Sequence, residues 1–95
     1  MSAYMVFIKE REHDAAAMEE YVKAVPASFA GHEIKGLSFY GKVESLEGPP
    51  LQGAVLVEFP TFEAAKAWYQ SEAYQEARKH RFQGADYRVF IVDGT

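Results

Sequence analysis

The sequence predicts a single α+β domain whose elements follow the order β-α-β-β-α-β, the arrangement called ferredoxin-like. Four apolar runs rich in strand-forming residues are separated by two segments in which apolar residues recur with helical spacing. The 95 residues leave room for one domain only, at 1–95. We therefore expect a four-stranded antiparallel sheet with the helices on one face.

The first half of the chain predicts a strand, a helix and a second strand. Residues 3–9 (AYMVFIK) are almost entirely apolar, which indicates a strand buried on both faces. Asp14 is suited to cap a helix at 15–25, and Pro26 should break or kink that helix. The buried face of this helix should be formed by Ala17, Met18, Tyr21, Val22 and Val25. A second strand is expected at 34–43.

The second half begins with a loop at 44–53, which leads into a third strand at 54–59 (AVLVEF). Thr61 should cap a second helix that runs to about Gln70. Ser71 should cap a third helix directly afterwards. Two helices in succession are therefore expected between the third and fourth strands.

Gly84 should end the third helix, and the last strand is expected at 86–92.

The strands carry apolar residues on both of their faces. In the first strand Phe7 points to one face, while Val6 and Ile8 point to the other. Helices on one side cannot cover both faces, so the second face needs another cover. A second copy of the same sheet is the simplest cover, and we expect a homodimer.

Composition limits the function. Seven Phe, six Tyr and one Trp are more aromatic residues than one small core needs, which indicates an interface or a small-molecule pocket. The absence of cysteine excludes disulfides, thiolate nucleophiles and cysteine metal sites. The net charge of −4, without a block of Lys or Arg, argues against nucleic-acid binding. No signal-peptide pattern or membrane-spanning apolar stretch is visible, so we expect a cytoplasmic protein without membrane contact.

Four motifs carry a family resemblance: LEG at 46–48, VEFP at 57–60, EAAKAWYQSEAY at 63–74 and IVDG at 91–94. Together, in this order and spacing, they resemble the domain of unknown function 1330 (DUF1330) family of the dimeric α/β-barrel superfamily. The resemblance implies a ferredoxin-like protomer and a dimer whose sheets face each other. It implies no settled function.

The chain departs from the family pattern at two places. Where the family usually has an Arg-Gly-Gly-like segment near the end of the second strand, this chain has Tyr40, Gly41 and Lys42. Where a basic residue commonly precedes the third strand, Gln52 and Gly53 stand here. If the family's cations bind an anionic ligand, part of that binding is lost in this chain. Lys42 would replace it only as a point charge.

Glu58 is the leading candidate for chemistry because it is a charge inside an otherwise apolar strand. In a hydrophobic pocket it would act as a general base or acid with a raised pKa. The alternatives are a structural ion pair with Arg81 or Arg88, or a solvated strand end beside Pro60.

Tyr40 could donate a hydrogen bond to a ligand carbonyl or enolate, or it could be a packing residue with its tip in water. Glu44 could share a proton or a cation with Glu47 at the end of the sheet, or both could be solvated loop residues. Trp68 could line a substrate pocket, although its helical position favours core packing.

Arg81 is the candidate anchor for a substrate carboxylate, and His80 with Arg81 could form a mixed cation site. Their place near a helix C-terminus is the simpler explanation for both. The histidines are scattered and none pairs with another ligand at metal-binding spacing, so we expect no metal site.

Two functions remain open. The first is a cofactor-independent enzyme that acts on a small carbonyl or aromatic compound by acid/base chemistry, in an apolar pocket between sheet and helices. This rests on analogy with cofactor-free monooxygenases, cyclases and isomerases of the barrel superfamily. The second is a non-catalytic small-ligand-binding or stress-associated dimeric module. No cofactor is expected in either case, since no dinucleotide or phosphate-loop motif is present.

Overall fold

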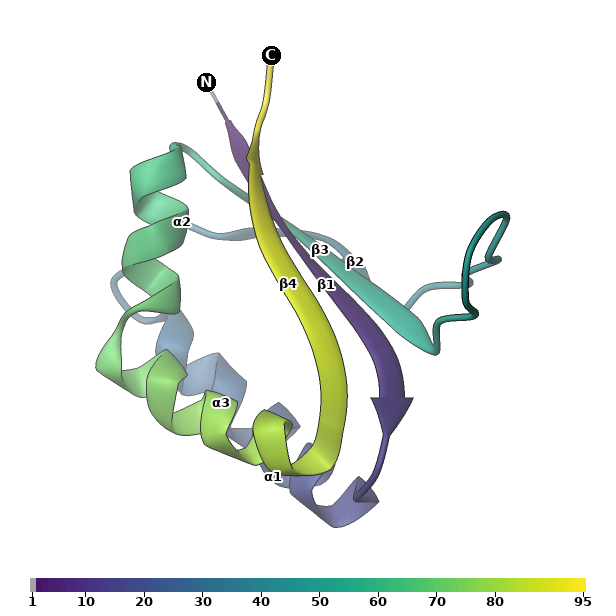
Figure 1. The fold of residues 1–95 in the computed structure, drawn as a ribbon. Coiled ribbons are helices and arrows are strands. Elements are labelled where there is room, and N and C mark those ends of the chain that lie inside the picture. The colour runs from purple at the N-terminus through teal and green to yellow at the C-terminus, as the bar shows by residue number, and fades with distance from the viewer. Residues whose placement is uncertain (1) are drawn as a thin grey trace.

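A computed structural model describes residues 2–95 and confirms the predicted order of elements (Figure 1). The elements are β1 (Ala3–Glu12), α1 (Ala15–Ala24), the 3-10 helix η1 (Val25–Phe29), β2 (Lys35–Phe39), β3 (Gly53–Phe59), α2 (Phe62–Tyr69), α3 (Glu72–Gly84) and β4 (Ala85–Asp93). None of the described helices is long and apolar enough to cross a membrane.

The four strands form one antiparallel sheet in the order β2-β3-β1-β4, with β1 and β3 in the centre. The helices lie together on one side of this sheet, as Figure 1 shows. The sheet is open at the β2 and β4 edges, so a single protomer is no closed barrel. The predicted ferredoxin-like fold is therefore confirmed for the protomer.

The helix starts are set by the side chains that the sequence indicated. The Asp14 carboxylate accepts hydrogen bonds from the backbone N–H groups of Ala16 and Ala17, at 3.0 and 3.3 Å. The hydroxyls of Thr61 and Ser71 each accept a hydrogen bond from the backbone N–H of the residue three positions later, at 3.0 and 3.3 Å. Such caps contribute about 0.5–2 kcal/mol each.

Two strands differ in length from the prediction. β2 ends at Phe39 rather than at residue 43, because Tyr40 adopts a φ of 54° in the left-handed region and leaves the extended course. β1 continues to Glu12, because Arg11 and Glu12 pair with the start of β4 after a register shift. The chain after β2 therefore forms a longer loop, which projects away from the helices (Figure 1).

The core lies between the sheet and the helices. Along β3 buried residues alternate strictly with half-buried ones, and the buried set faces the helices. Trp68 and Tyr74 form its centre, with ring centroids 4.2 Å apart. α1 packs mainly against α3 and not directly on the sheet. Space therefore remains between α1 and the β2–β3 half of the sheet.

The opposite face of the sheet has no cover from any other part of residues 2–95. Its side chains are half-buried or exposed, and most are apolar. This uncovered face is formed by Tyr4, Val6, Ile8, Ala54, Leu56, Glu58, Arg88, Phe90 and Val92. Phe90 and Val92 remain 45% and 46% exposed, and with the neighbouring apolar side chains they form an exposed apolar patch.

Candidate functional site

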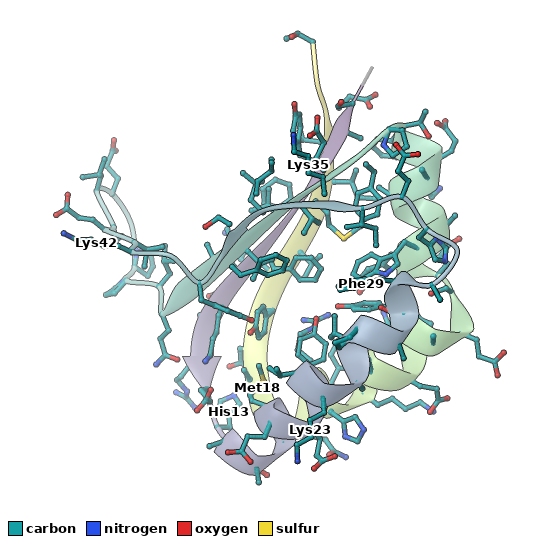
Figure 2. The ribbon with its side chains drawn as sticks, turned by 180° about the vertical axis from the view of Figure 1, so that it is seen from behind. His13, Met18, Lys23, Phe29, Lys35 and Lys42 are labelled. Carbon is teal, nitrogen blue, oxygen red and sulfur yellow. The ribbon has the colours of Figure 1, made fainter. Side chains whose placement is uncertain are left out.

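The space beside α1 is an apolar cavity of about 310 Å³. β1 and β3 supply Phe7 and Val55 to its floor, and η1 supplies Phe29, whose position between helix and sheet is visible in Figure 2. Tyr21 of α1 and Trp68 of α2 complete the opposite wall. No Asp, Glu, His, Lys or Arg of residues 2–95 lines this cavity. Its size and apolar lining suit a small aromatic ring.

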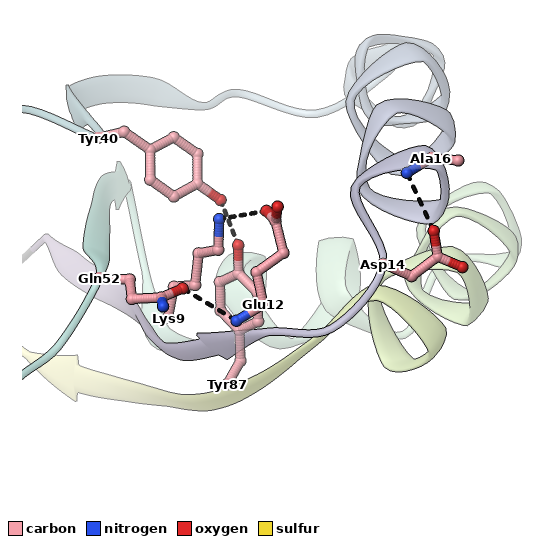
Figure 3. Close-up of polar contacts among 7 residues, drawn as sticks. All are labelled: Lys9, Glu12, Asp14, Ala16, Tyr40, Gln52 and Tyr87. Atoms are coloured by element: carbon pink, nitrogen blue, oxygen red, sulfur yellow. Dashed lines mark hydrogen bonds and ion pairs between the residues drawn. The ribbon is translucent and has the colours of Figure 1, made fainter.

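Tyr40 stands at the edge of this cavity and is held there by its backbone and by its hydroxyl. Its N–H donates to the carbonyl of Ala54 at 2.9 Å, and its hydroxyl lies 2.5 Å from the hydroxyl of Tyr87 (Figure 3). A Cβ atom at Gly53 would lie 2.8 Å from the Tyr40 ring, so the ring fits only because residue 53 is glycine. The left-handed backbone of Tyr40 is a strained conformation of the kind found at functional sites.

Trp68 is part of the cavity wall and of the core at once, because only 3% of it is exposed. Its indole N–H donates to the Ser28 hydroxyl at 3.1 Å, and that hydroxyl donates to the carbonyl of Val25 at 2.6 Å. The polar atom of the indole is therefore already satisfied. Trp68 offers a ligand its ring face and no hydrogen bond.

Arg81 does not line the cavity and is 2% exposed. It lies behind the two tyrosines that do, Tyr21 and Tyr40, which we call the tyrosine wall. Its guanidinium carbon is 4.9 Å from the ring centroid of Tyr87 and 5.9 Å from that of Tyr21, with Phe7 and Phe82 also within 6 Å. Among residues 2–95, no carboxylate oxygen lies within 4 Å of it, and its Nε has no hydrogen-bond partner. The predicted direct anchor for a substrate carboxylate is thus separated from the cavity by tyrosines.

Three tyrosines surround this guanidinium and remain protonated at neutral pH. Burial raises the pKa of Tyr21, Tyr74 and Tyr87 above the ordinary value, although the charge of Arg81 acts in the opposite direction. The hydroxyls of Tyr21 and Tyr74 are 2.8 Å apart. The hydrogen bond to Tyr40 further raises the pKa of Tyr87, as expected when Tyr87 is the donor.

Glu58 does not line the cavity. It alternates with the buried residues Val57 and Phe59 and lies half-buried on the uncovered face, opposite Tyr4 of β1. In the described part of the chain no Lys, Arg or His nitrogen lies within 4 Å of its carboxylate, so the suggested ion pairs with Arg81 and Arg88 do not form. Its position gives no support to a role as base for a compound bound in the cavity.

The remaining candidates are not brought to the cavity either. Glu44 and Glu47 are exposed residues of the projecting loop, where Lys42 also lies far from the helices (Figure 2). His80 is half-buried on α3, and successive helical residues point about 100° apart. His80 therefore does not share the buried position of Arg81. Within residues 2–95, no three metal-ligating side chains are grouped closely enough to hold an ion.

The hydroxyl network could not be predicted from the sequence. Tyr21 was expected only as a core residue, and neither Tyr74 nor Tyr87 was expected near Arg81. Their residue type held the signal, since a tyrosine in a buried position needs a partner for its hydroxyl. Which hydroxyls meet could not be read from the chain, because 53 positions separate Tyr21 from Tyr74 and 47 separate Tyr40 from Tyr87.

A Glu58→Gln variant should bind a compound in the cavity within twofold of wild type, because residue 58 lies on the other side of the sheet. Titration with acetophenone, followed by the fluorescence of the single tryptophan Trp68, measures this. A tenfold loss of affinity would return Glu58 to the binding site and contradict the placement described above.

Comparisons with known proteins agree with this fold. The profile of the family described as domain of unknown function (DUF1330) matches residues 2–95. A protein of unknown function from Rhodopseudomonas palustris superimposes with a TM-score of 0.74 at 22% identity, over 99% of this chain and 82% of that chain. No curated protein matches the chain.

Two further solved structures share the fold at low identity. A dimeric ferredoxin-like protein of unknown function from Jannaschia has a TM-score of 0.70 at 14% identity, covering 99% of this chain and all of that one. A cofactor-independent oxygenase from Streptomyces nogalater has a TM-score of 0.63 at 8% identity, with 99% and 93% coverage. These likenesses concern the fold, whereas the profile match spans nearly the whole sequence. The chain belongs to the DUF1330 family.

Proposed function

We propose that this protein binds a small aromatic or carbonyl compound in the cavity and acts on it without a cofactor, by acid/base chemistry. The observation that carries the proposal is the apolar cavity itself, with the Tyr40 hydroxyl as a polar group at its edge. A well-formed apolar pocket with few convergent polar groups is the default binding site of a small domain. The cofactor-independent oxygenase among the proteins of similar fold supports the chemistry by analogy only.

The Tyr40–Tyr87 pair can stabilise negative charge on a ligand oxygen. Two hydroxyls joined by one hydrogen bond retain one proton that is free to be donated elsewhere. If Tyr87 donates to Tyr40, the free proton is that of Tyr40, which lines the cavity. No side-chain base of residues 2–95 lines the cavity, so a water molecule would take the proton from the carbon beside the carbonyl. The hydrogen bond from Tyr40 would strengthen as the carbonyl oxygen becomes an enolate oxygen, and the barrier to enolisation would fall.

A non-catalytic binding or stress-associated module is the second candidate. It is favoured by the absence of carboxylates and imidazoles from the described cavity lining, since these are the usual general bases. Binding is common to both candidates, so proton transfer must separate them.

We further propose that two copies pair through the uncovered sheet face, so that their sheets face each other as in a dimeric α/β barrel. The apolar, half-exposed side chains of that face support this, as do the dimeric proteins of the same fold. The net charge of −4 makes a nucleic acid an unfavourable partner.

Acetophenone and ethylbenzene test the cavity as a matched pair, because they differ in the carbonyl oxygen. Both should bind wild type, whereas Tyr40→Phe should weaken acetophenone about 3- to 10-fold, the effect of one net hydrogen bond, and leave ethylbenzene unchanged. Calorimetry or chemical shifts of the cavity residues would measure the affinities. If neither compound binds in the cavity, the proposed site is wrong.

Exchange of the acetophenone methyl protons in D₂O separates the two candidates. An enzyme that stabilises the enolate should accelerate the exchange, as followed by proton NMR, and Tyr40→Phe should abolish the acceleration. A binding module should hold acetophenone without accelerating the exchange.

A further inference from the structure

We infer that the cavity selects acidic phenols and binds them as phenolates, because an uncompensated guanidinium lies behind its tyrosine wall. This inference rests on the proposed function in one respect, namely that the cavity is the binding site. It adds the chemical class of the ligand and assigns Arg81 a role as a positioning residue that acts through tyrosines.

The charge of Arg81 has no counter-ion among the residues that the structure describes. Charged side chains are almost never fully buried unless they are paired, yet Arg81 is 2% exposed and has no carboxylate within 4 Å among residues 2–95. Aromatic rings stabilise the guanidinium through their π faces. Rings carry no net charge, so the positive potential of Arg81 persists around them.

The neighbouring groups leave this potential in place. Tyr21 of α1, Tyr74 of α3 and Tyr87 of β4 face the guanidinium, and burial keeps all three neutral by raising their pKa. Two carboxylates near this end of the sheet have other partners. Glu12 pairs with Lys9 at 2.6 Å and Asp86 with His13 at 2.9 Å. A negative charge in the cavity would therefore meet the positive potential of Arg81, which no carboxylate within 4 Å among residues 2–95 offsets.

The path from Arg81 to the cavity runs through hydroxyl groups. Tyr87, whose ring is the closest of the four to the guanidinium, is hydrogen-bonded to Tyr40, and Tyr40 lines the cavity. Tyr21 lines the cavity from the other side and also faces Arg81. A ligand oxygen that accepts a hydrogen bond from Tyr40 would lie in the positive potential of Arg81 without contacting its guanidinium.

A phenolate fits this arrangement better than a carboxylate. A carboxylate has two oxygens with about four acceptor positions, and it pays a large desolvation cost when few donors are present. When Tyr87 donates to Tyr40, Tyr40 offers one hydroxyl proton to a ligand. The hydroxyl of Tyr21 is already paired with that of Tyr74, and the other lining residues are apolar. A phenolate has one oxygen for that donor and a ring for the apolar wall.

The test is the pKa of 4-nitrophenol bound to the protein, read from the visible absorbance of its phenolate during a pH titration. Transfer to an apolar cavity alone would raise this pKa, because burial disfavours the charged form. We expect a lowered pKa in wild type. Arg81→Met should raise it by about one unit or more relative to wild type, since a unit charge several ångströms away at an effective dielectric of about 20 has an effect of this size.

Arg81→Lys is the matched variant, because it keeps the charge and loses the planar donor group. In this variant the pKa of bound 4-nitrophenol should be lowered nearly as far as in wild type. A purely structural role for Arg81 would not predict this result. 4-Nitrobenzoate should bind wild type at least tenfold more weakly than 4-nitrophenolate, and equal binding would overturn the choice of phenol over carboxylate.

The outcomes separate this inference from the proposed function. If acetophenone binds and the pKa of bound 4-nitrophenol is raised, or is the same in wild type and Arg81→Met, the inference is overturned and the binding site stands. If neither compound binds, the site itself is wrong and the inference falls with it. If Arg81→Met does not fold, the pKa of 4-nitrophenol bound to wild type decides alone. A lowered pKa supports the inference, and a raised pKa overturns it.

Discussion

Val6→Asp should convert the proposed homodimer into a destabilised monomer. Val6 lies at the centre of the uncovered face, paired with Leu56 of β3 on one side and Phe90 of β4 on the other. A standard interface buries on the order of 1,200–2,000 Å² in total, and a carboxylate in its middle would lose hydration without gaining a partner. We expect the dissociation constant of the dimer to increase at least 100-fold, as measured by light scattering and analytical ultracentrifugation at micromolar concentrations.

Leu46→Asp is the matched control, because it also places a carboxylate at an exposed leucine. Leu46 is 84% exposed in the projecting loop and does not belong to the uncovered face. The control should remain a dimer with an unchanged melting temperature. A wild-type protein that is a monodisperse monomer at micromolar concentration would refute the dimer, and equal effects of both substitutions would move the interface away from the sheet.

Stability should fall steeply above about pH 10 because of the buried Tyr21–Tyr74 pair. The folded-state pKa of both groups is raised above the unfolded value of about 10, chiefly by burial. Below that value both states are protonated and the stability is fully present. As the pH rises beyond it, only the unfolded state loses these protons, and the pair should cost about 3 kcal/mol per pH unit at most.

Denaturant unfolding at fixed protein concentration between pH 8 and 11 would measure this slope, with circular dichroism and tyrosinate absorbance as parallel signals. The double variant Tyr21→Phe with Tyr74→Phe is the control, because it removes both hydroxyls and leaves neither partner unsatisfied. Its slope should be clearly shallower than that of wild type. Ionisation of all six tyrosines while the circular dichroism stays native would contradict the prediction.

The order of elements and the helix starts were predictable from the sequence because they depend on short-range interactions. A cap such as Asp14 bonds to N–H groups two and three residues away, so its residue type is nearly sufficient evidence. The period-2 and period-3.6 patterns are equally local, and they assigned every strand and α-helix apart from the lengths of β1 and β2, but not the 3-10 helix η1. The parity of β3 likewise placed Glu58 on the face of Ala54 and Leu56, as observed.

The site was decided by the tertiary structure alone. Whether the face of Glu58 is the one beneath the helices depends on which side of the sheet they pack, and parity within one strand carries no such information. The cavity exists because α1 rests on α3 and leaves room above β3, which is a matter of helix–helix contact. Arg81 was expected at a helix end, but its burial among aromatic rings from four elements required those elements to be assembled. Local spacing thus determined the fold of this protein, whereas its candidate chemistry depends on residues that meet only when distant segments pack together.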